Sequence, residues 1–320
     1  MAGFRFVLLA ILIAPTLALA QASRAPVPAA PTEDVTVNGL RNVPDAVIDK
    51  FIGAMTSPAR AGKIARWKTG VCPKTTGLAP KFAAYITWRV RDVARQIGAP
   101  IAADDGCKPN IHIIFIDQPQ ALLDGVRKKS PAYLGYYDNE TQADALAKVT
   151  RPIQSWYVTQ TEDVHGALHF DSHVTGGSSM VEVVLPCIIP PCTDSDTIKL
   201  PSAQAYATTG TRLGDGLSSV FFHVLVVADP ARLSDNAVGA MADYIALLAL
   251  TQIDKPDVCG TLPSILNLLA PDCAQKPGAM TQADAAFLRG VYKITPTTTV
   301  GGQRDEVAYQ MRRVLGGEKN

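Results

Sequence analysis

The chain has 320 residues, of which 47% are hydrophobic and 18% charged, so it is apolar enough to bury a sizeable core. It carries 30 basic and 29 acidic residues. This balance gives no electrostatic attraction to nucleic acid or to an anionic membrane surface, so neither is expected as a partner.

The first 20 residues have the three parts of a secretory signal peptide. Arg5 is their only charge, residues 6–13 form an unbroken apolar run, and Ala18 and Ala20 place small side chains where a signal peptidase reads them. The apolar run is too short for a permanent membrane anchor, which is the alternative reading. We predict cleavage between Ala20 and Gln21, no transmembrane segment after cleavage, and a periplasmic or secreted protein.

An even number of cysteines in an exported chain predicts a set of disulfide bonds. The sequence leaves the pairing open, and proximity favours Cys72–Cys107, Cys187–Cys192 and Cys259–Cys273. A metal–thiolate cluster is the alternative, but the chain has no Cys-x-x-Cys pair to support it.

Residues 21–34 are rich in Ala and Pro and are predicted to form a flexible leader, followed by a single α+β domain over residues 35–320. Apolar periodicity predicts the elements of this domain in chain order. They are a helix after Pro44 to Met55, a strand at 63–71, a helix at 82–97 capped by Gly98, strands at 111–116, 153–159, 180–185 and 220–227, and helices at 237–250, 281–292 and 304–315.

The predicted helix at 237–250 is apolar on nearly every side, which is typical of a central buried helix. Asp243 is its single charge. A lone carboxylate on such a helix needs a partner, and we expect a structural one such as an arginine rather than a catalytic role.

This order of elements resembles that of the metzincin zinc proteases, matrixins in particular. Residues 242–252 lie where those enzymes place H-E-x-x-H-x-x-G-x-x-H, residues 263–266 look like their Ser-x-Met turn, and residues 281–292 look like the L-T-x-x-D…L…Y closing helix. The resemblance implies a zincin-like single domain with a mixed sheet, a long N-terminal helix, a central buried helix and C-terminal helices. Generic α+β packing is the alternative.

The departures from the family pattern decide the expected chemistry. Ala242, Ala246 and Gln252 stand where the three zinc-binding histidines belong, Asp243 where the glutamate base belongs, and Leu266 where the methionine belongs. Alanine has no atom that can bind zinc, so no metal is expected to activate water here. The chain resembles an uncharacterised group of exported proteobacterial proteins with a zincin-like fold but without the metal site.

A second candidate site is the cluster of His165, His169, Asp171 and His173. On a strand, the last three side chains would share one face, and on a helix the three histidines would lie along one side. Either arrangement could bind a transition metal through imidazole nitrogen. The alternative is the solvated face of an exposed hairpin, which the neighbouring Gly166 favours.

Two further histidines, His112 and His223, lie within apolar strands, and each is expected to be a hydrogen-bonded core or sheet-face histidine rather than a metal ligand. The leading interpretation is an exported, non-catalytic binding or structural protein of the cell envelope, with no cofactor and an envelope protein or peptide as its partner. The alternative function is a metal-dependent hydrolase that uses His165, His169 and His173.

Overall fold

The computed structural model describes residues 43–103, 106–171, 180–185, 196–201, 208 and 214–316. The predicted signal peptide, the leader, the Cys187–Cys192 pair and His173 lie outside the described residues. Within them, no helix combines the length and the apolar character that crossing a bilayer requires.

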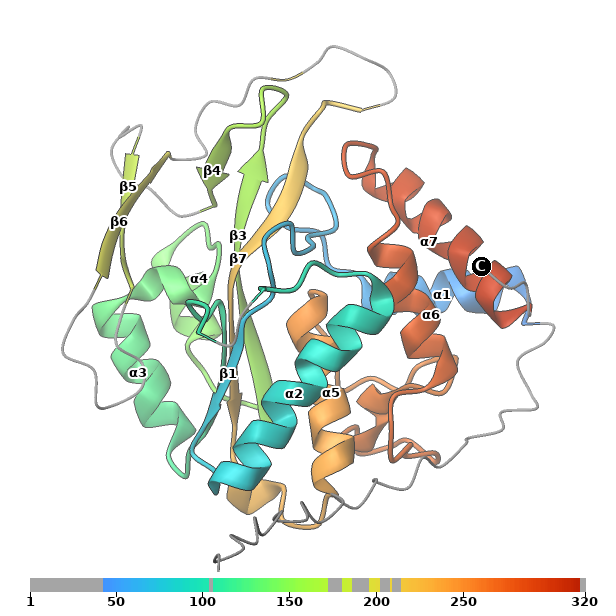
Figure 1. The fold of residues 1–320 in the computed structure, drawn as a ribbon, viewed down its shortest axis with the longest axis horizontal. Helices are drawn as coiled ribbons and strands as arrows, with labels where there is room; N and C mark the ends of the chain where they lie inside the picture. Colours follow the sequence, from blue (N-terminus) through green and yellow to red (C-terminus); the bar gives the residue numbers. More distant parts are fainter. Residues whose placement is uncertain are drawn as a thin grey trace, which may run out of the picture. The chain divides into compact units, whose positions relative to one another are not determined.

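The centre of the fold is a mixed five-stranded sheet with the strand order β1-β2-β7-β3-β4 (Figure 1). Strands β1, β2 and β7 are parallel, and β3 runs antiparallel to both β7 and β4. A separate hairpin pairs β5 with β6. The strand bounds are β1 Pro73–Thr76, β2 Ile111–Phe115, β3 Ile153–Glu162, β4 Leu168–Phe170, β5 Met180–Leu185, β6 Asp196–Pro201 and β7 Ser218–Ala228.

Helices α2 and α5 lie against one face of the sheet, and α1, α6 and α7 extend the same core (Figure 1). The inward-facing residues alternate along β7, because Val224 and Val226 belong to this core while Leu225 packs on the opposite face. The helix bounds are α1 Asp45–Met55, α2 Pro80–Ile97, α5 Val238–Leu250, α6 Gln282–Val291 and α7 Val300–Leu315, with 3₁₀ turns η2 Pro230–Arg232 and η3 Ile265–Leu268.

The predicted periodic helices are confirmed. Helix α2 begins with Pro80 in its first turn and ends at Gly98, whose φ of 83° is the left-handed cap that glycine adopts without strain. Helix α5 is buried from Ala240 to Leu250. The α+β class and the central buried helix therefore follow the expectation from the apolar pattern, and the sheet is mixed, as the resemblance implied.

Three elements that the sequence pattern did not predict cover the opposite face of the sheet. They are α3 Pro119–Lys129, the 3₁₀ helix η1 Pro131–Leu134 and α4 Glu140–Leu146. In α3 only Leu123 and Val126 are buried. So narrow an apolar stripe gives little periodic signal in the sequence. These helices are therefore found only in the structure, where they pack on the sheet.

The predicted strand at 63–71 is wrong. This segment forms only isolated bridges, Arg66 with Val220 among them, and the ladder begins later at β1. Hydrogen bonds that involve side chains anchor the 63–71 segment instead. The Trp67 indole donates to the Ala249 carbonyl at 2.9 Å, and the Ile64 amide donates to the Gln303 side chain at 2.8 Å. The Trp67 ring also packs against the Phe221 ring of β7, with centroids 5.4 Å apart, so side-chain contacts and isolated bridges hold this segment without a continuous ladder.

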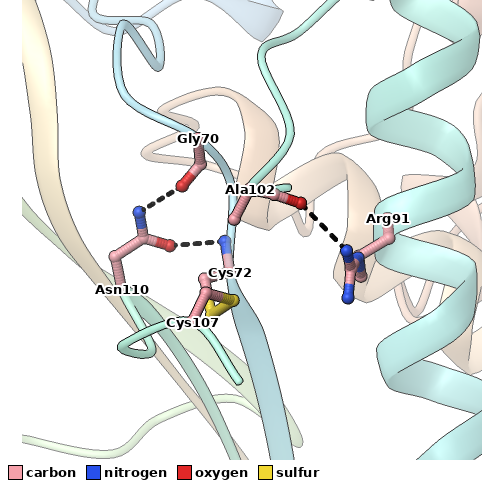
Figure 2. The surroundings of a disulfide bond; sticks show 6 residues. All are labelled: Gly70, Cys72, Arg91, Ala102, Cys107 and Asn110. Carbon is pink, nitrogen blue, oxygen red and sulfur yellow. Dashed lines mark hydrogen bonds between the residues drawn. A yellow bond between two sulfur atoms is a disulfide. The ribbon is translucent and has the colours of Figure 1, made fainter. Parts of the chain in front are cut away.

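Two of the predicted disulfides are present, Cys72–Cys107 and Cys259–Cys273. Figure 2 shows the first, beside the point where the chain enters β1. There the Asn110 side chain accepts from the Cys72 amide at 2.8 Å and donates to the Gly70 carbonyl at 2.9 Å. The covalent link and the amide bridge together tie the start of β1 to the start of β2.

Candidate ligand site

The part of α5 that stands where metzincins place their zinc motif is buried in the core. The Ala242 and Ala246 side chains are fully buried in α5. Asp243 is also buried, and it accepts from the Arg89 Nε at 2.5 Å and from the Met280 amide at 2.7 Å. Burial alone would lower the pKa of Arg89, but the hydrogen bonds and the negative charges of Asp243 and Asp92 together outweigh burial and raise this pKa. The expected arginine partner is confirmed, and Asp243 joins α2, α5 and the segment before α6.

The predicted histidine cluster lies on the β3–β4 hairpin. His165 is exposed at the turn, and His169 Nε2 lies 3.0 Å from the Asp163 carboxylate. Asp163 also accepts from the His165 and Ala167 amides at 2.9 and 3.0 Å, so it organises the turn. The hydrogen bond from His169 lowers the pKa of Asp163 to about 2.

Asp171 belongs to a buried network rather than to an open coordination site. Its two carboxylate oxygens accept from the Thr159 and Thr161 hydroxyls at 2.7 and 2.8 Å. Burial raises its pKa despite these bonds. Among the residues that the structure describes, no three His, Cys, Asp or Glu side chains are grouped as a metal site would require. The metal-binding role of the cluster stays a prediction, since His173 lies outside the described residues.

His112 and His223 form a hydrogen-bonded pair across β2 and β7. His112 Nδ1 lies 2.6 Å from His223 Nε2, and the Tyr133 ring packs edge-on against His223 with centroids 4.6 Å apart. Burial lowers the pKa of His112 to about 4, with the charge of Lys74 acting in the same direction. Burial also lowers the pKa of His223 well below its usual value. The prediction that each is a hydrogen-bonded core or sheet-face histidine is confirmed, because His223 is buried and the half-buried His112 is bonded to it on the sheet.

This pair predicts acid-sensitive stability. The unfolded imidazoles bind protons below pH 6.5, whereas the folded His112 resists protonation to about pH 4, so stability is full above pH 6.5 and falls as the pH drops through this window. For His112 alone we expect a loss of about 3 kcal/mol at pH 4. Urea unfolding at pH 7 and pH 4 measures it. The double variant His112→Leu/His223→Leu is the control, because its carboxylates are those of wild type and contribute the same pH dependence. If the stability of this variant falls between pH 7 and pH 4 as much as that of wild type, the histidine pair is not the cause of the loss.

A cavity of about 390 Å³ lies beside β3. Four segments that are distant in sequence line it, namely 57–60, 134–136, 151–159 and 252–256. The outer edge of β3 faces it, since β4 pairs only with Gln160–Glu162 and no other described strand pairs with the preceding part of that edge. Gly135 allows the covering loop to approach, because a Cβ there would lie 2.4 Å from the Tyr157 carbonyl oxygen.

The cavity lining carries both signs of charge. Arg60 stacks over the Tyr136 ring, 4.7 Å from its centroid, and Arg151 pairs with Asp257 at 3.0 Å. On the acidic side, the Asp254 Oδ2 accepts from the Ser57 hydroxyl at 2.5 Å. Polar groups of both charges that line one cavity beside aromatic side chains are common features of a small-molecule site.

Two buried polar atoms of lining residues, the Gln252 Oε1 and the Arg151 Nε, have no hydrogen-bond partner among the described residues. Such atoms are rare in folded proteins because each costs free energy comparable to a lost hydrogen bond. One is an acceptor and the other a donor, so a bound molecule with complementary groups could satisfy both.

Sequence reasoning did not find this cavity. Gln252 was singled out only as the residue standing in a third zinc-ligand position, and the structure places it on the cavity wall. The other lining residues form no local motif, because the cavity exists only where separate segments meet. The one signal in the sequence that could have indicated the cavity is that a polar residue, Gln252, follows directly after the end of an apolar helix.

Comparisons of the chain with protein-family models, with curated proteins and with solved structures found no match.

Proposed function

We propose that the mature chain is an exported, non-catalytic binding protein that holds a small polar molecule in the cavity beside β3. A degenerate metalloprotease-like scaffold is part of this proposal, with its former catalytic helix retained as core. The observation that carries the proposal is that two residues lining one cavity, Gln252 and Arg151, each hold a buried polar atom that has no hydrogen-bond partner among the described residues.

The sealed state of α5 supports a binding role over proteolysis. Ala242 and Ala246 offer no ligand atoms and no access, and Asp243 is engaged by Arg89 and the Met280 amide. The two disulfides and the polar cavity suit a protein that binds its partner outside the cytoplasm.

A matched pair of variants tests the binding role. Gln252→Leu and Thr251→Val each remove a buried polar atom that has no described partner, but only Gln252 lines the cavity. We expect each variant to raise the free energy of unfolding by about 1 kcal/mol, because the unsatisfied group disappears. Only Gln252→Leu should weaken binding.

For the measurement, the protein is first unfolded to release any bound molecule and then refolded. The refolded protein is dialysed against the small-molecule fraction of a bacterial extract. Molecules retained by the protein are released in methanol and identified by mass spectrometry, and thermal unfolding is recorded in parallel. We expect wild-type and Thr251→Val protein to retain the same molecule and Gln252→Leu to lose it. Equal retention by all three proteins, or retention by none, would overturn the proposal.

A further inference from the structure

We propose that the cavity binds a small zwitterion of the amino-acid and dipeptide class, with its carboxylate at Arg151 and its ammonium group at Asp254. This inference rests on the proposed binding function and names the chemistry of the ligand.

The carboxylate end is defined by Arg151. Its Nη2 is already held by Asp257 at 3.0 Å, while its buried Nε has no described partner. Arg151 is a lining residue of the cavity, so its guanidinium, held on one side by Asp257, offers a positive charge to an incoming carboxylate. A charge-assisted hydrogen bond of this kind is about twice as strong as a neutral one. Arg60 adds a second positive charge to the cavity lining.

The ammonium end is defined by Asp254. Its Oδ2 accepts from the Ser57 hydroxyl, and no basic side chain pairs with this carboxylate among the described residues. It is therefore a fixed negative charge on the cavity wall with one oxygen, Oδ1, available to an ammonium donor. Asp257, by contrast, pairs with Arg151 and does not line the cavity.

Both charges lie close enough to influence the same hydroxyl. Burial is the main cause that raises the pKa of Tyr157, the charge of Asp254 raises it further, and the charge of Arg151 lowers it. Tyr157, on β3, lines the same cavity as Arg151 and Asp254. A molecule with opposite charges at its two ends fits such a pair of poles better than a simple anion or cation.

Size and backbone geometry favour short peptides within this class. A volume of about 390 Å³ is near the lower end for small-molecule sites. The outer edge of β3 between Gln154 and Val158 has no neighbouring strand among the described residues. A peptide unit can hydrogen-bond to such an edge as an added strand does, while its charged ends are held by side chains.

The test is calorimetric titration with L-alanyl-L-alanine and two capped derivatives, N-acetyl-L-alanyl-L-alanine and L-alanyl-L-alaninamide. Each cap removes one charge and leaves the rest of the molecule intact. We expect each cap to weaken binding by about tenfold or more, the loss of one charge-assisted hydrogen bond. Equal affinity for the free and capped peptides would overturn the zwitterion assignment.

Variants locate the two poles. Asp254→Asn should weaken binding of the free dipeptide but not of its N-acetyl form, and Arg151→Met should weaken the free dipeptide but not its carboxamide. The control is Lys255→Met, which is next to Asp254 in sequence but does not line the cavity. It should bind the free dipeptide as wild type does.

The outcomes separate the two proposals. If no peptide binds but the extract experiment yields another molecule that Gln252→Leu loses, only the zwitterion class is overturned. If neither experiment detects a bound molecule, both proposals fail and the cavity is filled by water alone. A free dipeptide that binds equally well to Asp254→Asn would overturn the assigned orientation.

Discussion

Replacing Asp284 with alanine is expected to lower the free energy of unfolding by about 4 kcal/mol. This carboxylate is fully buried between η3 and α6. It accepts from the Ser264 hydroxyl at 2.6 Å, the Ile265 amide at 2.8 Å and the Thr281 amide at 3.0 Å. Burial also raises the pKa of this carboxyl group. Alanine would leave these donors buried without an acceptor.

The capping role of the same residue adds to the loss. Thr281 and Asp284 form a capping box at the start of α6, in which the Asp284 amide donates to the Thr281 hydroxyl at 3.1 Å. Urea unfolding of the variant measures the change. Asp305→Ala, which removes an exposed acid on α7, serves as control and should stay within about 0.5 kcal/mol of wild type. Similar small losses for both variants would contradict the network.

Removing the Cys72–Cys107 disulfide by a double alanine substitution is expected to cost about 4 kcal/mol. The bond closes a segment with a sequence separation of 35 residues, which contains the whole of α2. Without it, the unfolded chain gains the conformational entropy of that loop. The folded state also loses the covalent tie between the starts of β1 and β2, where Asn110 supplies the remaining bridge (Figure 2).

The second disulfide is the internal control for this prediction. Cys259–Cys273 spans only 14 residues, so its removal should cost less, about 3 kcal/mol. Denaturant unfolding of the two double variants under oxidising conditions gives both values. A larger loss for the Cys259–Cys273 variant would show that loop entropy does not govern these bonds and that local packing does.

The sequence by itself predicted the elements whose burial is regular along a continuous segment. Helix α2 shows its apolar stripe and Gly98 cap in the sequence, and α5 is marked by its nearly complete apolar composition. The same reasoning predicted an arginine partner for Asp243, because a charge inside an apolar helix must be compensated. Disulfide pairing by proximity was confirmed for the two described bonds.

Only the tertiary structure decided the features that depend on distant segments. The apolar residues of 63–71 give the same local pattern whether they pair in a sheet or pack on helices, and the contacts of Trp67 with Ala249 settle the choice. The cavity is assembled from four separate stretches of chain, so neither Arg151 nor Asp254 stands out by its neighbours in sequence. Periodicity records which side of a segment is buried, whereas a binding cavity forms where segments leave space between them.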